Sequence, residues 1–189
     1  MVSSDDKKDH VLGLGAKGVL NRKDFNCWGQ LPTVNGPEFS DYMKESRKFG
    51  KAIWEITNKQ DVDIVFEHPG ESTFPVSVFV VKRGGMVVIC AGTTGFNLTM
   101  DARFLWMRQK RVQGSHFAHL KQASAANQLV INRRIDPGMS EVFTWDQIPE
   151  AHDKMLDNKH LPGNMAVLVT SPKPGLRTVE DVLAVNGQA

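Results

Sequence analysis

The chain has 189 residues, with 23 Lys+Arg against 21 Asp+Glu and therefore a formal net charge of +2. Hydrophobic residues make up 41% and charged residues 23%, as in folded globular proteins. This composition excludes a disordered, collagen-like or coiled-coil chain, and so small a charge does not indicate nucleic-acid binding. We predict a cytoplasmic protein without a membrane partner. Its two cysteines are too few for a disulfide scaffold, and it has neither a signal-peptide pattern nor an apolar run long enough to span a bilayer.

The N-terminal third begins with the stub of a strand at residues 1–4, and Ser4 is placed to cap a helix over 5–14. Glycines and short polar turns then predict a loop over 22–37. Apolar residues at helical spacing predict a longer helix over 38–57, with Gly50 as a weak point.

The middle of the chain alternates between apolar strands and helices. We expect strands at 62–66, 86–91 and 112–115. We expect a helix or turn at 73–81 and helices at 101–109 and 119–132. This alternation is typical of the α/β class, with a doubly wound parallel sheet covered on both faces.

The last third changes character after the break at Asp136-Pro137-Gly138. A strand at 141–144, a helix at 148–158, a turn at 160–164 and a strand at 165–169 are expected there. We interpret residues from about 135 onward as leaving the doubly wound sheet for a neighbouring unit.

Gly13, Gly15 and Gly18 match the dinucleotide pattern G-x-G-x-x-G. That pattern binds a pyrophosphate only when a strand precedes it and a helix follows, because the helix N-terminus must face the phosphates. Here a charged helix precedes the glycines and a strand follows, so we interpret them as a helix stop.

The strand stub at the N-terminus carries more information about a cofactor. An NAD enzyme ends the second strand of its dinucleotide-binding sheet in Asp or Glu, which binds the ribose hydroxyl. This chain has Ser3 and Ser4 there, followed by Lys7, a set that suits the 2′-phosphate of NADP. The alternative is a plain helix cap with a solvated charged face. With a cofactor bound, the first strand and the true glycine loop are expected upstream of residue 1.

Several longer runs are distinctive. They are DIVFEHPGE (63–71), RGGMVVICAGTTGFN (83–97), LWMRQKRVQGSHFAHL (105–120) and LPGNMAVLV (161–169), joined by FNCWGQLPTVN (25–35) and GLRTVEDVL (175–183). Over essentially its whole length the chain resembles the crotonyl-CoA carboxylase/reductases and crotonyl-CoA reductases of the medium-chain dehydrogenase/reductase superfamily. The resemblance implies that 1–134 is a partial NADP-binding Rossmann domain, and that 135–189 returns to a GroES-like catalytic domain whose main part lies upstream.

The resemblance also implies a reaction. NADPH delivers hydride to the β-carbon of an enoyl-CoA such as crotonyl-CoA, and the resulting enolate attacks carbon dioxide to give ethylmalonyl-CoA. Enoyl-CoA and carbon dioxide are then the substrates, no metal is required, and the full-length enzyme is expected to be a homo-oligomer. We expect the chain to be inactive without the upstream region. Two alternatives stay open: a non-carboxylating enoyl-CoA or quinone reductase, and an inactive truncated product.

Residues of the site follow from the resemblance and from strand order. His116 in Gly-Ser-His-Phe matches the family histidine that organises carbon dioxide. Gly92, Thr93 and Thr94 follow an apolar strand and are expected beside the nicotinamide, because ligands bind at the carboxyl ends of parallel strands. Glu67 and His68 end a neighbouring strand and are further cofactor contacts.

Basic side chains are candidates for binding the phosphates of CoA. We favour Arg103, because it closely follows the cofactor loop; the other candidates are Arg47, Lys48, Lys51, Lys110 and Arg111. His116 and His119 have the H-x-x-H spacing of a metal site, but no acidic or cysteine ligand lies nearby in the sequence. Cys27 and Cys90 are interpreted as buried apolar side chains.

Overall fold

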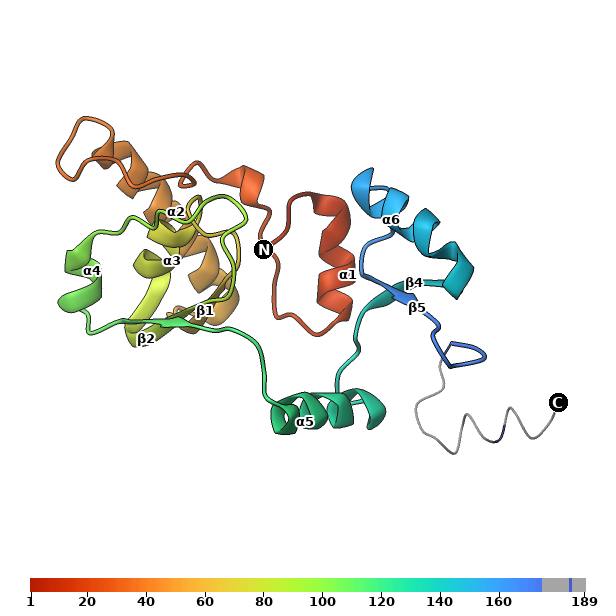
Figure 1. Ribbon diagram of the computed structural model, residues 1–189. Helices are drawn as coiled ribbons and strands as arrows, with labels where there is room; N and C mark the ends of the chain where they lie inside the picture. The colour runs from red at the N-terminus through yellow and green to blue at the C-terminus, as the bar shows by residue number, and fades with distance from the viewer. Residues whose placement is uncertain (175–183, 185–189) are drawn as a thin grey trace. The chain divides into compact units, whose positions relative to one another are not determined.

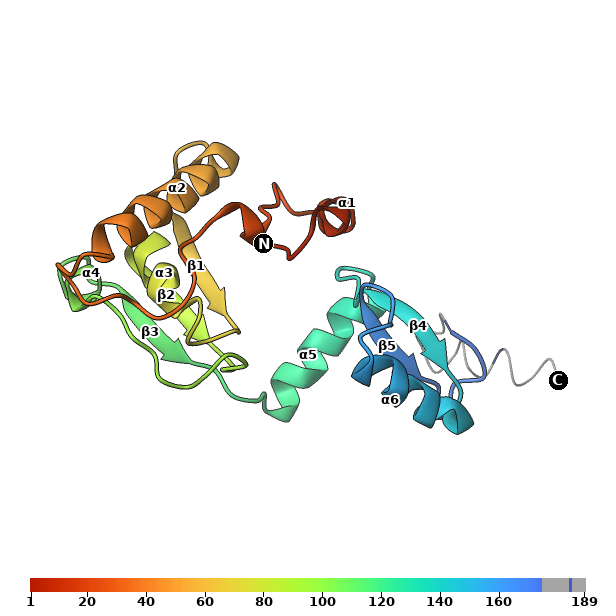
Figure 2. The same ribbon diagram turned by 90° about the horizontal axis from the view of Figure 1, so that it is seen from above.

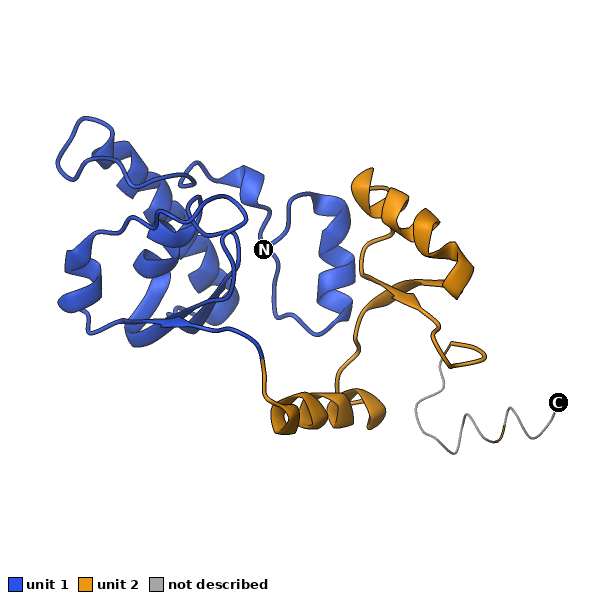
Figure 3. Ribbon diagram, in the orientation of Figure 1, with its two compact units in different colours: residues 1–117 blue, residues 118–189 orange. Residues whose placement is uncertain are grey.

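The computed structural model describes residues 1–174 and residue 184, and the chain divides into two compact units, Met1–Phe117 and Ala118–Ala189 (Figure 3). Each unit contains a parallel sheet and helices, so the predicted α/β class is confirmed. The units divide after Phe117, whereas the sequence places the change of domain at residue 134. The GroES-like assignment of 135–189 stays a prediction, and the run at 175–183 lies outside the described residues.

The first unit is built on three parallel strands, β1 (Val62–Glu67) and β2 (Val81–Ile89), labelled in Figure 1, and β3 (Arg111–Gly114). Figure 2 shows them in that order across the sheet. Their register pairs Glu67 with Ile89 and Ile89 with Gly114. All three strands therefore reach their carboxyl ends at one edge of the sheet, where the loops that follow them meet.

Two helices cover one face of this sheet as successive layers (Figure 2). The helix α3 (Phe74–Val80) contacts β1 and β2, and α2 (Phe39–Thr57) packs on α3. Phe74 and Val78 of α3 face the sheet, where they pack with Val81 and Val87 of β2. On its other side α3 contributes Val76 to a second cluster, whose buried members also include Phe25, Cys27, Tyr42, Met43 and Phe49.

The N-terminal segment begins with a strand stub, as predicted. Val2 forms an isolated parallel bridge with Asn21, and its amide donates to the carbonyl of Leu20 at 2.9 Å. A 3₁₀ turn (Asp5–Lys7) and the helix α1 (Lys8–Gly13) follow, and a second 3₁₀ turn spans Arg22–Asp24. Ser4 occupies the N-cap position, but its side chain makes no capping hydrogen bond, so that part of the prediction is wrong.

Two elements differ from their predicted bounds. The strand β2 begins at Val81 and not at Met86, because its pairing with β1 tolerates an irregularity between the Val62–Val81 and Ile64–Met86 pairs. Gly84 adopts a positive φ of 71° within that irregularity. The helix α4 (Ala102–Trp106) is shorter than predicted, and Gln109 with a φ of 51° turns the chain into β3.

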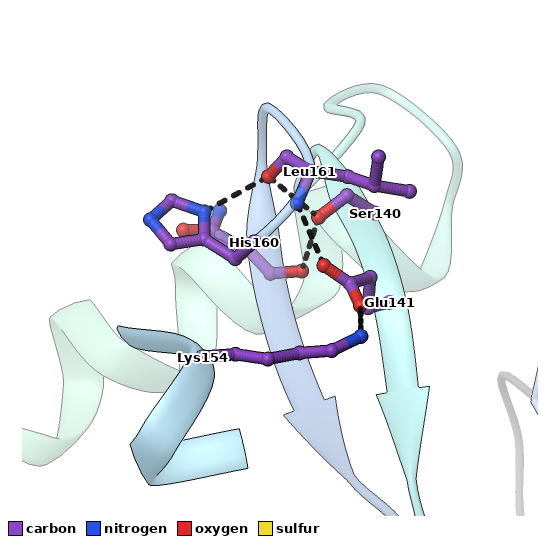
Figure 4. A network of polar contacts seen from close by, with 6 residues as sticks. Ser140, Glu141, Lys154, His160 and Leu161 are labelled. Atoms are coloured by element: carbon purple, nitrogen blue, oxygen red, sulfur yellow. Dashed lines mark hydrogen bonds and ion pairs between the residues drawn. The ribbon is translucent and has the colours of Figure 1, made fainter. Parts of the chain in front are cut away.

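The second unit contains the helix α5 (Leu120–Ile131), the strand β4 (Met139–Phe143), a 3₁₀ turn (Trp145–Gln147), the helix α6 (Ile148–Leu156) and the strand β5 (Asn164–Val167). The two strands are parallel, and Phe143 and Ala151 are buried. The carboxylate of Glu141 accepts hydrogen bonds from Lys154 of α6 and from the amide of Leu161 (Figure 4). Among the described helices of the whole chain, none is long and apolar enough to cross a membrane.

Candidate functional site

The loops after β1 (residues 68–72) and after β2 (residues 90–97) are joined by hydrogen bonds at the carboxyl edge of the sheet, and together we name them the two-loop site. The amide of Thr94 donates to the carbonyl of Pro69 at 2.8 Å. The amide of Ser72 donates to the Thr94 hydroxyl at 3.0 Å, and that of Glu71 to the Gly95 carbonyl at 3.3 Å. Neither loop can move without disturbing the other.

A close contact between glycines brings the loops together. Gly70 has a φ of 90°, and a Cβ atom there would lie 2.8 Å from the Gly95 oxygen and 2.9 Å from the Gly92 Cα. A Cβ atom added at Gly92 would in turn lie 2.8 Å from the ring of Phe96 and 3.0 Å from the Gly95 oxygen. The predicted glycine-rich loop is therefore present, and its glycines permit backbone contact that any side chain would prevent.

Segment 25–35 lies against the loop after β1 and against Thr99, which follows the loop after β2. The amide of Gly29 donates to the Ser72 carbonyl at 2.7 Å, and the side chain of Gln30 donates to the Glu71 carboxylate. The amide of Leu31 donates to the Thr99 hydroxyl at 3.1 Å. The sequence predicts this segment only as a loop, and its role as a support for the two-loop site emerges from the structure.

The predicted cofactor residues after β1 and β2 are brought together, with one exception in orientation. The exposed hydroxyl of Thr93 lies 3.4 Å from both Nδ1 and the carbonyl oxygen of the exposed His68. Thr94 and Gly92 belong to the same turn. Glu67, in contrast, is only 2% exposed, and its carboxylate accepts hydrogen bonds within the protein, so this geometry gives no support to the predicted direct contact with a cofactor.

The predicted phosphate-binding residues at the N-terminus also gather. The Lys7 ammonium group lies 3.5 Å from the Ser3 hydroxyl, to which it donates. Ser3 and Ser4 are half-buried, and Lys7 is exposed. A hydroxyl and a cation beside the end of a strand form a suitable set of donors for a phosphate monoester.

His116 follows the carboxyl end of β3, at the sheet edge that carries the two-loop site. The amide of Ser115 continues the ladder by donating to the Ile89 carbonyl at 2.8 Å. The exposed His116 ring contacts the ring of Phe117 with centroids 3.9 Å apart. An imidazole there is free to meet a ligand bound at this edge.

Arg103, the favoured CoA contact, is already engaged. Its guanidinium group forms an ion pair with the buried Asp101 at 2.7 Å, and Asp101 also caps α4 through the Arg103 amide. The hydrogen bonds from Arg103 hold the pKa of Asp101 below its usual value. A second, unpaired role for Arg103 thus receives no support from the structure.

A cavity of about 440 Å³ lies near the amino ends of the strands and is a stronger candidate for phosphates. Its wall is apolar and aromatic on one side, with Trp54, Phe79 and Phe104. Its cationic residues are Arg47, Lys51, Arg83, Arg108 and Lys110, and among the described residues that line it Asp61 alone is acidic. Arg47, Lys51 and Lys110 are among the candidates predicted from the sequence, whereas Arg83 and Arg108 are not, because no sequence pattern shows that β2 and the segment after α4 meet α2 around one cavity.

Within this cavity Lys110 is half-buried. Its ammonium group donates to the carbonyls of Val78 and Phe79, at 2.8 and 2.9 Å. Burial, with a smaller contribution from the nearby Arg108, lowers the pKa of Lys110 to about 8. Its charge near neutral pH therefore depends on the surroundings, as does its attraction for an anion.

Cys27 and His119 have structural roles in the fold. Cys27 is 1% exposed, and burial raises the pKa of its thiol to about 12, which suits a buried apolar side chain. His119 caps α5 by accepting a hydrogen bond from the Gln122 amide. Over the described residues no group of three or more His, Cys, Asp or Glu side chains is placed to hold a metal ion.

Comparison with known proteins identifies the family of the chain. The family described as zinc-binding dehydrogenase matches residues 1–132. The crotonyl-CoA carboxylase/reductase of Cereibacter sphaeroides is 69% identical over the whole chain, which covers 44% of that protein. The crotonyl-CoA reductase of Streptomyces avermitilis is 39% identical over 93% of the chain, which covers 38% of that protein. The chain thus spans less than half the length of these curated relatives.

Solved structures give the same result. The structure of a crotonyl-CoA carboxylase/reductase aligns with the chain with a TM-score of 0.88 and 72% sequence identity. The alignment covers 97% of the chain and 43% of that protein. A 2-octenoyl-CoA carboxylase reductase in complex with NADP and 2-octenoyl-CoA matches 98% of the chain and 40% of its own, with a TM-score of 0.78 and 34% identity. The chain belongs to the zinc-binding dehydrogenase family, and the relatives it matches over its length include crotonyl-CoA carboxylase/reductases.

Proposed function

We propose that the chain is the NADPH-binding, C-terminal part of an enoyl-CoA reductase that also adds carbon dioxide to the enolate formed by hydride transfer. The observation that carries this proposal is the 69% identity to a crotonyl-CoA carboxylase/reductase along the entire chain. The parallel sheet supports it, because the two-loop site and His116 lie at the edge where such sheets bind ligands.

NADPH, when bound, supplies a hydride to the β-carbon of the enoyl thioester. In this proposal Ser3 and Lys7 bind the 2′-phosphate, for which their 3.5 Å approach supplies a hydroxyl and a cation. Thr93 and His68 present exposed polar groups to the nicotinamide end of the site. His116, on the same sheet edge, orients carbon dioxide towards the enolate.

The cationic cavity is proposed to hold the phosphates of CoA. Arginine forks and lysine ammonium groups bind phosphate oxygens, and the aromatic wall offers a stacking surface for adenine. A solved relative bound to 2-octenoyl-CoA supports a CoA thioester as the ligand class. This assignment replaces Arg103, which is paired with Asp101, by Arg47, Lys51 and Arg83 as principal contacts.

The cavity is tested by titrating the chain with adenosine 3′,5′-bisphosphate, which carries the phosphate end of CoA. Removing one cation with Arg83→Ala should weaken binding about tenfold, as expected for a charge-assisted hydrogen bond. Lys44→Ala is the matched control, because Lys44 is an exposed lysine of α2 outside the cavity. Equal affinities of the two variants would contradict the assignment.

The whole reaction is tested by co-expressing the chain with the preceding segment of the Cereibacter sphaeroides relative. We expect oxidation of NADPH that depends on crotonyl-CoA, and a carboxylated product when bicarbonate is present. A second candidate, reduction without carboxylation, is favoured by the 39% identity to a crotonyl-CoA reductase. The two candidates differ in their product. If the enzyme carboxylates and His116 orients carbon dioxide, His116→Ala should lower the carboxylated fraction of the product. If the enzyme only reduces, no carboxylated product should form with or without the substitution.

A further inference from the structure

Glu67, at the carboxyl end of β1, is a buried charged side chain that the proposed reaction does not use. Only 2% of its surface is exposed. One carboxylate oxygen accepts hydrogen bonds from the Gly70 amide, at 3.0 Å, and from the Thr73 hydroxyl. The other accepts from the Ser77 hydroxyl. No ion pair in the described part of the chain includes Glu67, so neutral donors alone satisfy it.

The first of these bonds reaches the two-loop site. The Gly70 amide is held by Glu67, and Gly70 lies so close to Gly92 and Gly95 that a Cβ atom would not fit between them. The Thr94 amide then donates to the carbonyl of Pro69, the neighbour of Gly70. A chain of hydrogen bonds and close contacts therefore connects Glu67 to the loop at 90–97 through the loop at 68–72.

The other bonds fix the carboxylate itself. Thr73 precedes α3 and Ser77 lies within it, so Glu67 joins the carboxyl end of β1 to the first turns of the helix that packs on the sheet. A carboxylate only accepts hydrogen bonds, and it faces donors on every side. An amide in its place has only one accepting oxygen and carries no charge, so at least one of the hydroxyl hydrogen bonds must reverse its direction and all of them lose the contribution of the charge.

We propose that Glu67 is a positioning residue that holds the two-loop site in the shape required for NADPH. It acts through Gly70 and Pro69, without touching the cofactor. The part that concerns NADPH rests on the proposed function, whereas the positioning of the loops is a property of the chain alone and is tested separately.

The test measures amide hydrogen exchange, residue by residue, by NMR on the 189-residue chain. Glu67→Gln is compared with Glu55→Gln, a control at an exposed carboxylate of α2. We expect exchange at Gly70, Thr94 and Gly95 to become about tenfold faster in Glu67→Gln, because charge-assisted hydrogen bonds are replaced by weaker neutral ones. Exchange at Val87 of β2 should not change.

A milder pair of variants covers the case in which Glu67→Gln fails to fold. Thr73→Val removes one donor to the carboxylate with little change in shape, and Thr73→Ser restores that donor. Thr73→Val should accelerate exchange at Thr94 and Gly95, and Thr73→Ser should return it to the original rate. Acceleration in Thr73→Val that stops at Gly70, or spreads evenly to Val87, would overturn the proposal.

NADPH titrations of the same variants test the second part. Affinity should fall in Thr73→Val and recover in Thr73→Ser, with Glu55→Gln unchanged. If the unsubstituted chain does not bind NADPH, the proposed function fails while the exchange rates still decide whether Glu67 positions the loops. If it binds, and Thr73→Val alters the loops without altering affinity, the positioning has no bearing on the cofactor and this proposal is wrong.

Discussion

Gly70 shows at the level of one residue how the two-loop site depends on backbone contact. Its φ of 90° is unfavourable for any other residue, and a Cβ would meet the backbone of Gly92 and Gly95 at less than 3.0 Å. We expect Gly70→Ala to destabilise the chain by on the order of 2 kcal/mol, from left-handed strain together with this overlap. Urea unfolding followed by circular dichroism measures the change.

Gly13→Ala is the control for that substitution. Gly13 lies in α1, and an added Cβ there meets nothing within 4 Å. This variant should keep or slightly raise the stability, since alanine favours a helix more than glycine does. Equal losses in both variants would show that the close contact at Gly70 is not required.

Lys110 should make the affinity of the cationic cavity for anions depend on pH. Because burial lowers its pKa to about 8, Lys110 is charged at pH 7 and largely neutral at pH 9. Affinity for adenosine 3′,5′-bisphosphate should fall between these pH values, and Lys110→Met should bind weakly with little further change. The pKa of Lys110 is lower in the folded chain than in the unfolded chain, so between about pH 8 and 10.5 the unfolded chain binds more protons. The contribution of Lys110 to the free energy of unfolding therefore increases as the pH rises through this range.

Calorimetric titrations at several pH values measure the affinity. A fall of the same size in Lys110→Met would assign the pH dependence to another group. The low pKa of Lys110 could not be predicted from the sequence, because it results from burial between α3 and the start of β3.

At the level of elements, periodicity predicts α2 and β1 within one residue at each end, since their apolar residues recur at regular spacing. It fails at the start of β2, where Gly84 and Gly85 resemble a turn but lie within a strand of irregular register. The sequence also predicts that loops meet at the carboxyl edge. The sequence does not predict the burial of Glu67, because the donors Gly70 and Ser77 come from a loop and from a helix packed on the strand.

Glu141 connects three elements of the second unit. Its carboxylate accepts from Lys154 of α6 and from Leu161 before β5, and these bonds hold its pKa below the usual value (Figure 4). A lowered folded pKa stabilises the unit above the unfolded pKa, and this contribution is lost as the pH falls through the folded value. We expect acid to loosen α6, detected by hydrogen exchange.

Glu141→Gln should loosen α6 at neutral pH and remove this part of the acid sensitivity. Asp146→Asn provides the control, since Asp146 is exposed in the same unit. An acid response of α6 that is identical in Glu141→Gln and in the unsubstituted chain would argue against this carboxylate as the sensitive group.

At the level of the whole molecule, β1 lies at one edge of its sheet, and its outward side chains are apolar. Ile64 is 61% and Phe66 is 69% exposed, on the face opposite α3. An open strand with exposed apolar side chains promotes association between chains. We expect the chain to self-associate at micromolar concentration and Phe66→Lys to reduce this, as measured by light scattering after gel filtration.

Gln60→Lys adds the same charge at an exposed position just before β1 and serves as the control. If it disperses the chain as well as Phe66→Lys does, net charge and not the apolar face governs association.

The central claim is that this chain carries an NADPH site, and titration by cofactor fluorescence tests it most directly. We predict saturable binding of NADPH at least about tenfold tighter than that of NADH, from the ionic hydrogen bonds of the 2′-phosphate with Lys7 and Ser3, and a loss of that preference in Lys7→Ala. Equal affinity for the two cofactors, or no saturable binding by a chain that circular dichroism shows to be folded, would contradict the account.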